Sequence, residues 1–134
     1  MDVITQLEAR GIQASPQRVA VAQVVLHTDA HPSAEEIHQL VRARLPGVSR
    51  ATIYNTLKLF VDKGLLDTLT FDEGRVVYDP KTDRHHHFID DDTGEVFDIP
   101  WEAFKVDQQA ELSQFHVREL AVVLRGTRLA KKPR

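Results

Sequence analysis

The chain has 134 residues and no cysteine, which leaves room for one ordinary domain or two small ones and excludes disulfides and thiolate zinc sites. Its 42% hydrophobic and 28% charged residues exclude a disordered chain. The net charge of −3 is unusual for a DNA-binding protein, but the acidic excess lies in the second half, around Asp90-Asp91-Asp92. That half would repel DNA unless a cation or a partner subunit changed the balance.

No apolar run is long enough to span a bilayer, so we expect no membrane partner. The amino terminus lacks the basic start and apolar stretch of a secretory signal. The expected location is therefore the cytoplasm.

The first seventy residues predict short helices with clear start signals. Ser15 followed by Pro16 marks the start of one helix, with an N-cap and a first-turn proline. Ser33 with Glu36 forms a capping box at the start of another. Ser49 can cap a third helix, whose apolar residues recur at helical spacing.

Two extended runs follow these helices, at residues 66–71 and 75–78, and a short loop that ends in Gly74 joins them. Two helices in close succession with a hairpin after them are the arrangement of a winged helix-turn-helix. We therefore predict a winged-helix DNA-binding domain over residues 1–79.

The pattern changes after Pro80. Residues 85–89 and 95–99 predict strands, residues 107–115 a helix, and the β-branched residues of 117–124 a third strand. The overall fold class is therefore α+β, with a small α/β domain over residues 80–134. Units this small need a partner surface, so we expect that domain to form a homodimer.

The helix over residues 49–58 is the predicted recognition helix, since Ile53 and Leu57 face inward and leave polar groups outward. Arginine and lysine suit phosphate or guanine, asparagine suits adenine, and tyrosine suits thymine methyls or phosphate. On composition alone, the segment could equally be an amphipathic helix with a solvated polar face. The capped helix before it and the wing after it favour DNA binding. The predicted DNA-binding residues, one of them on an earlier helix, are Arg18, Arg50, Thr52, Tyr54, Asn55 and Lys58.

Three consecutive histidines are the first sign of a metal site. In a strand, His85 and His87 project from one face and His86 from the other. Two imidazoles on one face are a common start to a transition-metal site, and a surface histidine run is the alternative. The remaining histidines, His27, His38 and His116, have no identifiable partners and are expected to be surface or core residues.

Further donors lie near the triplet in sequence. Asp79 ends the wing, His31 precedes a capped helix, and Asp98 stands in an otherwise apolar strand where an unpaired carboxylate would be costly. The strand register cannot be read from the sequence, so the neighbours of Asp98 are undetermined at this point. One hairpin pairing would set it beside His86 instead. Imidazoles and carboxylates without a thiolate favour Fe²⁺, Mn²⁺ or Zn²⁺ over soft metals.

Over nearly its whole length the chain resembles the ferric uptake regulator superfamily. The matching segments are Ser15-Pro16-Gln17-Arg18, His31-Pro32-Ser33-Ala34-Glu35-Glu36-Ile37, Arg50-Ala51-Thr52-Ile53-Tyr54-Asn55-Thr56-Leu57, Tyr78-Asp79, and the histidine triplet with Gly94-Glu95-Val96-Phe97-Asp98. The resemblance implies a homodimeric, metal-dependent repressor of operator DNA and not an enzyme. It also implies one regulatory site per protomer, for Fe²⁺ or Mn²⁺, with Zn²⁺ able to bind in vitro. The implied ligands are His31, Asp79, His85, His87 and Asp98.

Aspartate at position 98 makes the chain most similar to the peroxide-responsive branch of that superfamily. The resemblance then implies that hydrogen peroxide, the only small molecule expected as a signal, oxidises a histidine ligand in an Fe²⁺-catalysed reaction. That ligand would be His31 or His85. A regulator of iron or haem status is the alternative on the same scaffold. A metal hydrolase would need a substrate pocket, of which the sequence gives no sign.

The chain departs from many relatives at the structural zinc site, where two Cys-x-x-Cys pairs are usual. Asp90 and Thr93 align with the first pair, and Arg128 and Lys131 with the second, so no structural zinc is expected. A further family site also looks lost, because Leu120 stands where a histidine would be needed.

Overall fold

The computed structural model describes residues 2–71, 73–105 and 112–129. The chain forms two compact units, Met1–Thr82 and Asp83–Arg134. The boundary predicted after Asp79 lies slightly before this division. No helix among the described residues is long and apolar enough to cross a membrane.

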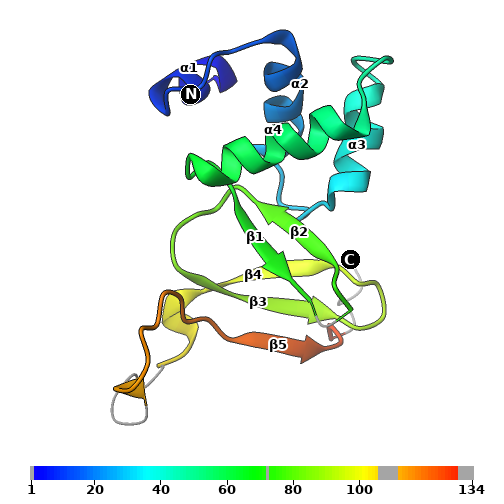
Figure 1. The fold of residues 1–134 in the computed structure, drawn as a ribbon. Helices are drawn as coiled ribbons and strands as arrows, with labels where there is room; N and C mark the ends of the chain where they lie inside the picture. The colour runs from blue at the N-terminus through cyan, green and yellow to red at the C-terminus, as the bar shows by residue number, and fades with distance from the viewer. Residues whose placement is uncertain (1, 72, 106–111, 130–134) are drawn as a thin grey trace. The chain divides into compact units, whose positions relative to one another are not determined.

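The first unit contains four helices and a two-stranded hairpin (Figure 1). Its elements are α1 (Val3–Ala9), α2 (Pro16–Val25), α3 (Ala34–Arg42), α4 (Arg50–Asp62), β1 (Asp67–Thr70) and β2 (Val76–Asp79). The three helix starts predicted from serine caps are confirmed: Ser15, Ser33 and Ser49 each accept a backbone N–H of the first turn. The short α1 was not predicted, although Asp2 caps it in the same way.

The core of this unit comes from one face of each helix. The large apolar side chains of this core that are completely buried are Leu7, Val21, Val25, Ile37, Val41, Ile53, Leu57 and Phe60. Burial of such side chains is the main stabilising contribution, about 1.5–3 kcal/mol each. The core fixes α4 against α2 and α3, with Ile53 and Leu57 inward as predicted.

The wing is tied to the start of α3 by backbone contacts. The Tyr78 N–H donates to the Pro32 carbonyl at 2.9 Å, and Ser33 forms an isolated β-bridge with Val77. Since β2 ends at Asp79, these contacts bring that residue beside the segment that precedes α3.

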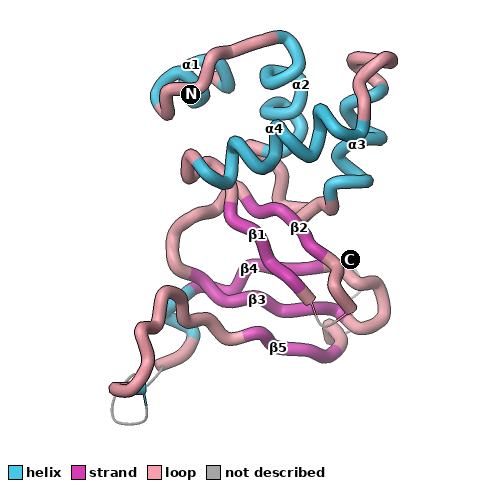
Figure 2. Tube along the Cα trace, in the orientation of Figure 1, coloured by secondary structure: helices cyan, strands magenta, loops and turns pink. Residues whose placement is uncertain are grey.

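The second unit is a three-stranded sheet with the order β4-β3-β5 (Figure 2). β3 (His85–Asp90) pairs antiparallel with β4 (Val96–Pro100) and parallel with β5 (Val123–Gly126), and a 3₁₀ turn, η1 (Trp101–Ala103), follows β4. The strands predicted over 85–89 and 95–99 are confirmed within one residue at each end.

The third predicted strand is only partly correct. It was expected over 117–124, but the ladder with β3 is confined to Val123–Gly126, so β-branched composition located the strand too early. The predicted helix over 107–115 lies mostly outside the described residues, and Leu112 to Phe115 form a turn closed by the Phe115 N–H.

An ion pair ties the end of β3 to the segment after β5. The Arg128 guanidinium lies 3.2 Å from the Asp90 carboxylate and 4.8 Å from the Phe97 ring centroid. Burial raises the pKa of Asp90, but the Asp92 N–H, Arg128 and the Thr93 N–H outweigh it and lower the pKa below its ordinary value of 3.8. The charged carboxylate therefore stabilises the fold.

We predict that Asp90→Asn lowers the midpoint of thermal unfolding at neutral pH. Because the folded pKa is depressed, this stabilisation is present above about pH 4 and is lost as the pH falls through the folded value. The difference between the two proteins should shrink as they are acidified. A difference that persists unchanged at about pH 3 would mean that the charge is not its source.

Candidate functional site

In the first unit, His31 and Asp79 form a buried polar pair. Their Nε2 and Oδ2 atoms are 3.2 Å apart, and the side chains are 2% and 5% exposed. His31 has a φ of +51°, the left-handed conformation that few residues other than glycine adopt. The second Asp79 oxygen accepts the Lys81 N–H at 2.9 Å, which orients the carboxylate. The pair offers one imidazole nitrogen and one carboxylate oxygen at the same point.

In the second unit, three predicted ligands meet on one face of the sheet. The Asp98 Oδ1 atom lies 3.1 Å from His85 Nε2 and 3.6 Å from His87 Nε2, and the two imidazole centroids are 4.5 Å apart. The register pairs His87 with Asp98 and His86 with Ile99. The alternative register, with Asp98 beside His86, is therefore not adopted.

The hydrogen bonding of His85 fixes which of its nitrogens can hold a cation. Nδ1 donates to the Asp83 carbonyl at 2.6 Å, because a carbonyl oxygen can only accept. This leaves Nε2 to share a proton or a metal ion with Asp98. A metal-binding histidine usually donates the N–H of its other ring nitrogen to a group such as a backbone carbonyl, which fixes the tautomer and the orientation of the ring.

The spacing of these donors fits a metal ion. Two ligands that lie about 2.1 Å from one ion and subtend a right angle are about 3.0 Å apart. The distances of 3.1 and 3.6 Å from Asp98 to the two histidines are close to that value. Two histidines and one carboxylate without a thiolate form a donor set that suits Fe²⁺, Mn²⁺ or Zn²⁺.

His86 lies on the opposite face of β3, as strand alternation predicts, and both of its nitrogens are engaged. Nδ1 accepts the Val122 N–H at 2.9 Å, and Nε2 donates to the Trp101 carbonyl at 3.2 Å. Its ring stacks on Trp101 with the centroids 4.7 Å apart and is completely buried. It joins β3 to the segments before β5 and after β4. Sequence reasoning did not anticipate this, since the partners are distant in the chain.

The predicted DNA-binding side chains of α4 divide into exposed and engaged groups. Tyr54, Asn55 and Lys58 are exposed, and the Lys58 ammonium lies 3.1 Å from the Asp62 carboxylate. The Thr52 hydroxyl accepts from Ser49 at 2.9 Å as part of the helix cap. Arg18, on α2, donates to the Gln13 carbonyl at 3.1 Å. Arg50 is exposed and pairs with Glu35.

His38 has a role that the sequence did not reveal. It was expected to be a surface or core residue without a partner, and it is a core residue. Its Nε2 donates to the Val48 carbonyl at 3.1 Å, directly before the Ser49 cap of α4. The expectation that it has no partner was wrong, because the bond joins α3 to the connection that follows it.

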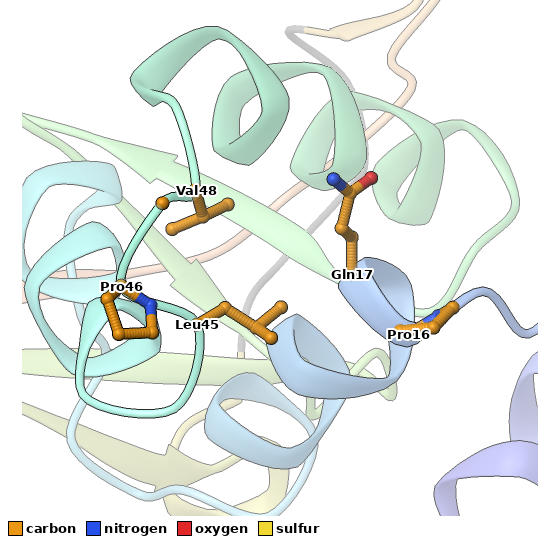
Figure 3. A pocket seen from close by; sticks show the side chains of 6 residues that line it. Pro16, Gln17, Leu45, Pro46 and Val48 are labelled. Carbon is orange, nitrogen blue, oxygen red and sulfur yellow. The ribbon is translucent and has the colours of Figure 1, made fainter.

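A hollow lies beside the start of α4. In Figure 3, Pro16 and Gln17 from the first turn of α2 stand on one side, and Leu45, Pro46 and Val48 from the α3–α4 connection stand on the other. Ser15, the cap of α2, directly precedes Pro16, and Ser49, the cap of α4, directly follows Val48, so the hollow is lined by residues next to both caps.

Known proteins resemble the chain over most of its length. The model of the ferric uptake regulator family matches residues 9–125. The peroxide-responsive repressor PerR of Staphylococcus epidermidis is 33% identical over 119 residues, which are 89% of this chain and 77% of that protein.

Solved structures agree with the sequence match. A zinc-bound manganese uptake regulator has a TM-score of 0.71 at 26% identity and covers 96% of this chain and 100% of its own. The ferric uptake regulator of Pseudomonas aeruginosa with manganese has a TM-score of 0.67 at 26% identity, covering 96% and 98%. The predicted fold class, a winged helix-turn-helix followed by a small α/β domain, is confirmed. The chain belongs to the ferric uptake regulator family.

Proposed function

We propose that the protein is a metal-dependent transcriptional repressor that binds operator DNA as a homodimer and releases it in response to hydrogen peroxide. The observation that carries the proposal is the group of His85, His87 and Asp98, with the His85 tautomer set by Asp83. A relative named as a peroxide-responsive repressor supports the choice of signal.

The proposed regulatory site holds one metal ion per protomer with five ligands from both units. His31 and Asp79 form the half that belongs to the winged helix, and His85, His87 and Asp98 form the half that belongs to the sheet. Each half is already assembled within its own unit. An ion that takes ligands from both would restrict how the DNA-binding unit is held, which would couple metal binding to DNA affinity.

Peroxide sensing requires a ligand that can be oxidised. With Fe²⁺ bound, one oxygen atom of hydrogen peroxide would be transferred to a histidine ligand and the other would leave as water, so the imidazole would supply the two electrons and the iron would act as a catalyst. Mn²⁺ and Zn²⁺ would fill the site without catalysing that transfer. We propose that His31 or His85 receives an oxygen atom and thereby becomes a poorer ligand. The chain has no cysteine to react instead.

The proposed DNA surface comprises α4, the start of α2 and the wing. Tyr54, Asn55 and Lys58 would enter or border the major groove, with Arg50 at the start of the helix. Thr52 would contribute mainly through the helix cap, and Arg18 through a backbone contact.

The first prediction concerns the signal. DNA binding is measured with Mn²⁺ and with Fe²⁺, before and after micromolar hydrogen peroxide, and the peptides are then examined by mass spectrometry. We expect only the Fe²⁺ form to lose affinity, with an added oxygen on a peptide containing His31 or His85. Retained affinity without that oxygen would refute peroxide sensing, and loss of affinity with haem would favour the alternative of iron or haem status.

A second prediction concerns the metal ligands. His87→Ala removes a donor within 3.6 Å of Asp98, so metal-dependent DNA binding should be lost. His116→Ala is the matched control, since His116 is exposed and belongs to neither half-site. If His87→Ala keeps the metal dependence, the ligand set has been assigned wrongly.

A third prediction separates DNA contact from metal binding. Tyr54 is 48% exposed on α4, so Tyr54→Ala should weaken DNA binding by about 1–3 kcal/mol while metal affinity stays nearly unchanged. Fluorescence anisotropy and metal titration of the same preparation measure the two quantities. An equal loss of both would indicate a structural defect.

A further inference from the structure

The start of α4 is held by two contacts from one face of α3. Glu35 Oε1 lies 3.0 Å from Arg50 Nη2, and His38, three residues further along α3, donates to the Val48 carbonyl at 3.1 Å. Residues three apart on a helix are neighbours, so both contacts come from the same stripe. The His38 contact is buried and holds the backbone, whereas the Glu35 contact is exposed and holds a side chain.

The Glu35–Arg50 pair contributes little to the stability of the fold. The two side chains are 46% and 63% exposed, and pairs this exposed contribute little to folding. The position of Arg50 matters more, because it is the first residue of α4. In a helix-turn-helix the first residues of the recognition helix meet the base edges.

An acidic neighbour changes what Arg50 can bind. Arginine offers five N–H donors in a planar fork, so contact of Nη2 with Glu35 leaves other donors available. The carboxylate lowers the attraction of the guanidinium for phosphate, which every DNA sequence presents equally. It also limits the directions in which the remaining donors can point, which matters for a base edge.

We propose that Glu35 is a specificity-determining residue that restrains Arg50 and weakens binding to DNA of any sequence more than binding to the operator. A repulsive element that penalises the wrong partner is a general route to specificity. This inference rests on the proposed DNA-binding function.

The test uses the full-length protein loaded with Mn²⁺. The probes are a duplex selected from a random pool by the wild-type protein and a scrambled duplex of the same composition. Affinity for each is measured over a range of salt concentrations. If the wild type selects no duplex, the proposed function itself fails, and that outcome is distinct from any result with the variants.

We expect Glu35→Gln to bind the scrambled duplex several-fold more tightly and to lose part of its preference for the selected one. If Arg50 gains one phosphate contact, the slope of log affinity against log salt on the scrambled duplex should steepen by about 0.9. The gain should vanish when Glu35→Gln is combined with Arg50→Gln, compared with Arg50→Gln alone.

Glu8→Gln is the control, because it removes the same charge from an exposed position on α1 of the same unit. An unchanged preference in Glu35→Gln would overturn the proposal. The proposal would also fail if Glu8→Gln gave the same gain, or if the gain survived without Arg50, since the effect would then be one of net charge.

Discussion

The arrangement of the histidine cluster in the second unit depends on which ring nitrogen of His85 carries a proton. Because the Asp83 carbonyl accepts from Nδ1, the other ring nitrogen faces Asp98 at 3.1 Å and is the one available to a proton or a metal ion. The antiparallel register sets Asp98 opposite His87, which completes the group. His86, on the reverse face, holds the segments before β5 and after β4 in place. His85 and His87 therefore lie with Asp98 on one face of β3, whereas His86 on the other face supports the neighbouring segments.

Much of this arrangement could be predicted from local sequence. Serine caps located α2, α3 and α4, and strand alternation separated His85 and His87 from His86. Long-range pairings could not be predicted in this way. The register of Asp98 depends on the whole hairpin, and the late start of β5 depends on its ladder with β3. The partner of His38 lies in the connection after its own helix, where no periodic pattern points. The missed α1 is short, with an apolar face of only Val3 and Leu7.

The DNA-binding unit shows a similar division between buried and exposed contacts. Its apolar core and the His38 bond fix the backbone of α4, so the position of the recognition helix does not depend on surface charge. The exposed pairs act on side chains instead: Glu35 with Arg50 and Asp62 with Lys58 both place an acid beside a predicted phosphate-binding group. With a net charge of −3, the chain does not rely on a uniformly basic surface. Affinity would then come from a few oriented groups.

The ion pair between Asp90 and Arg128 also bears on whether the second unit needs zinc to fold. Both residues align with positions that hold structural zinc in many relatives, and here their side chains bind one another. An ion pair between two side chains forms on folding without any metal, so a chelator cannot remove it. The folding of this unit would then be independent of zinc supply. Zinc starvation or the oxidation of thiols, which would disrupt a zinc–thiolate site, would then leave this unit folded.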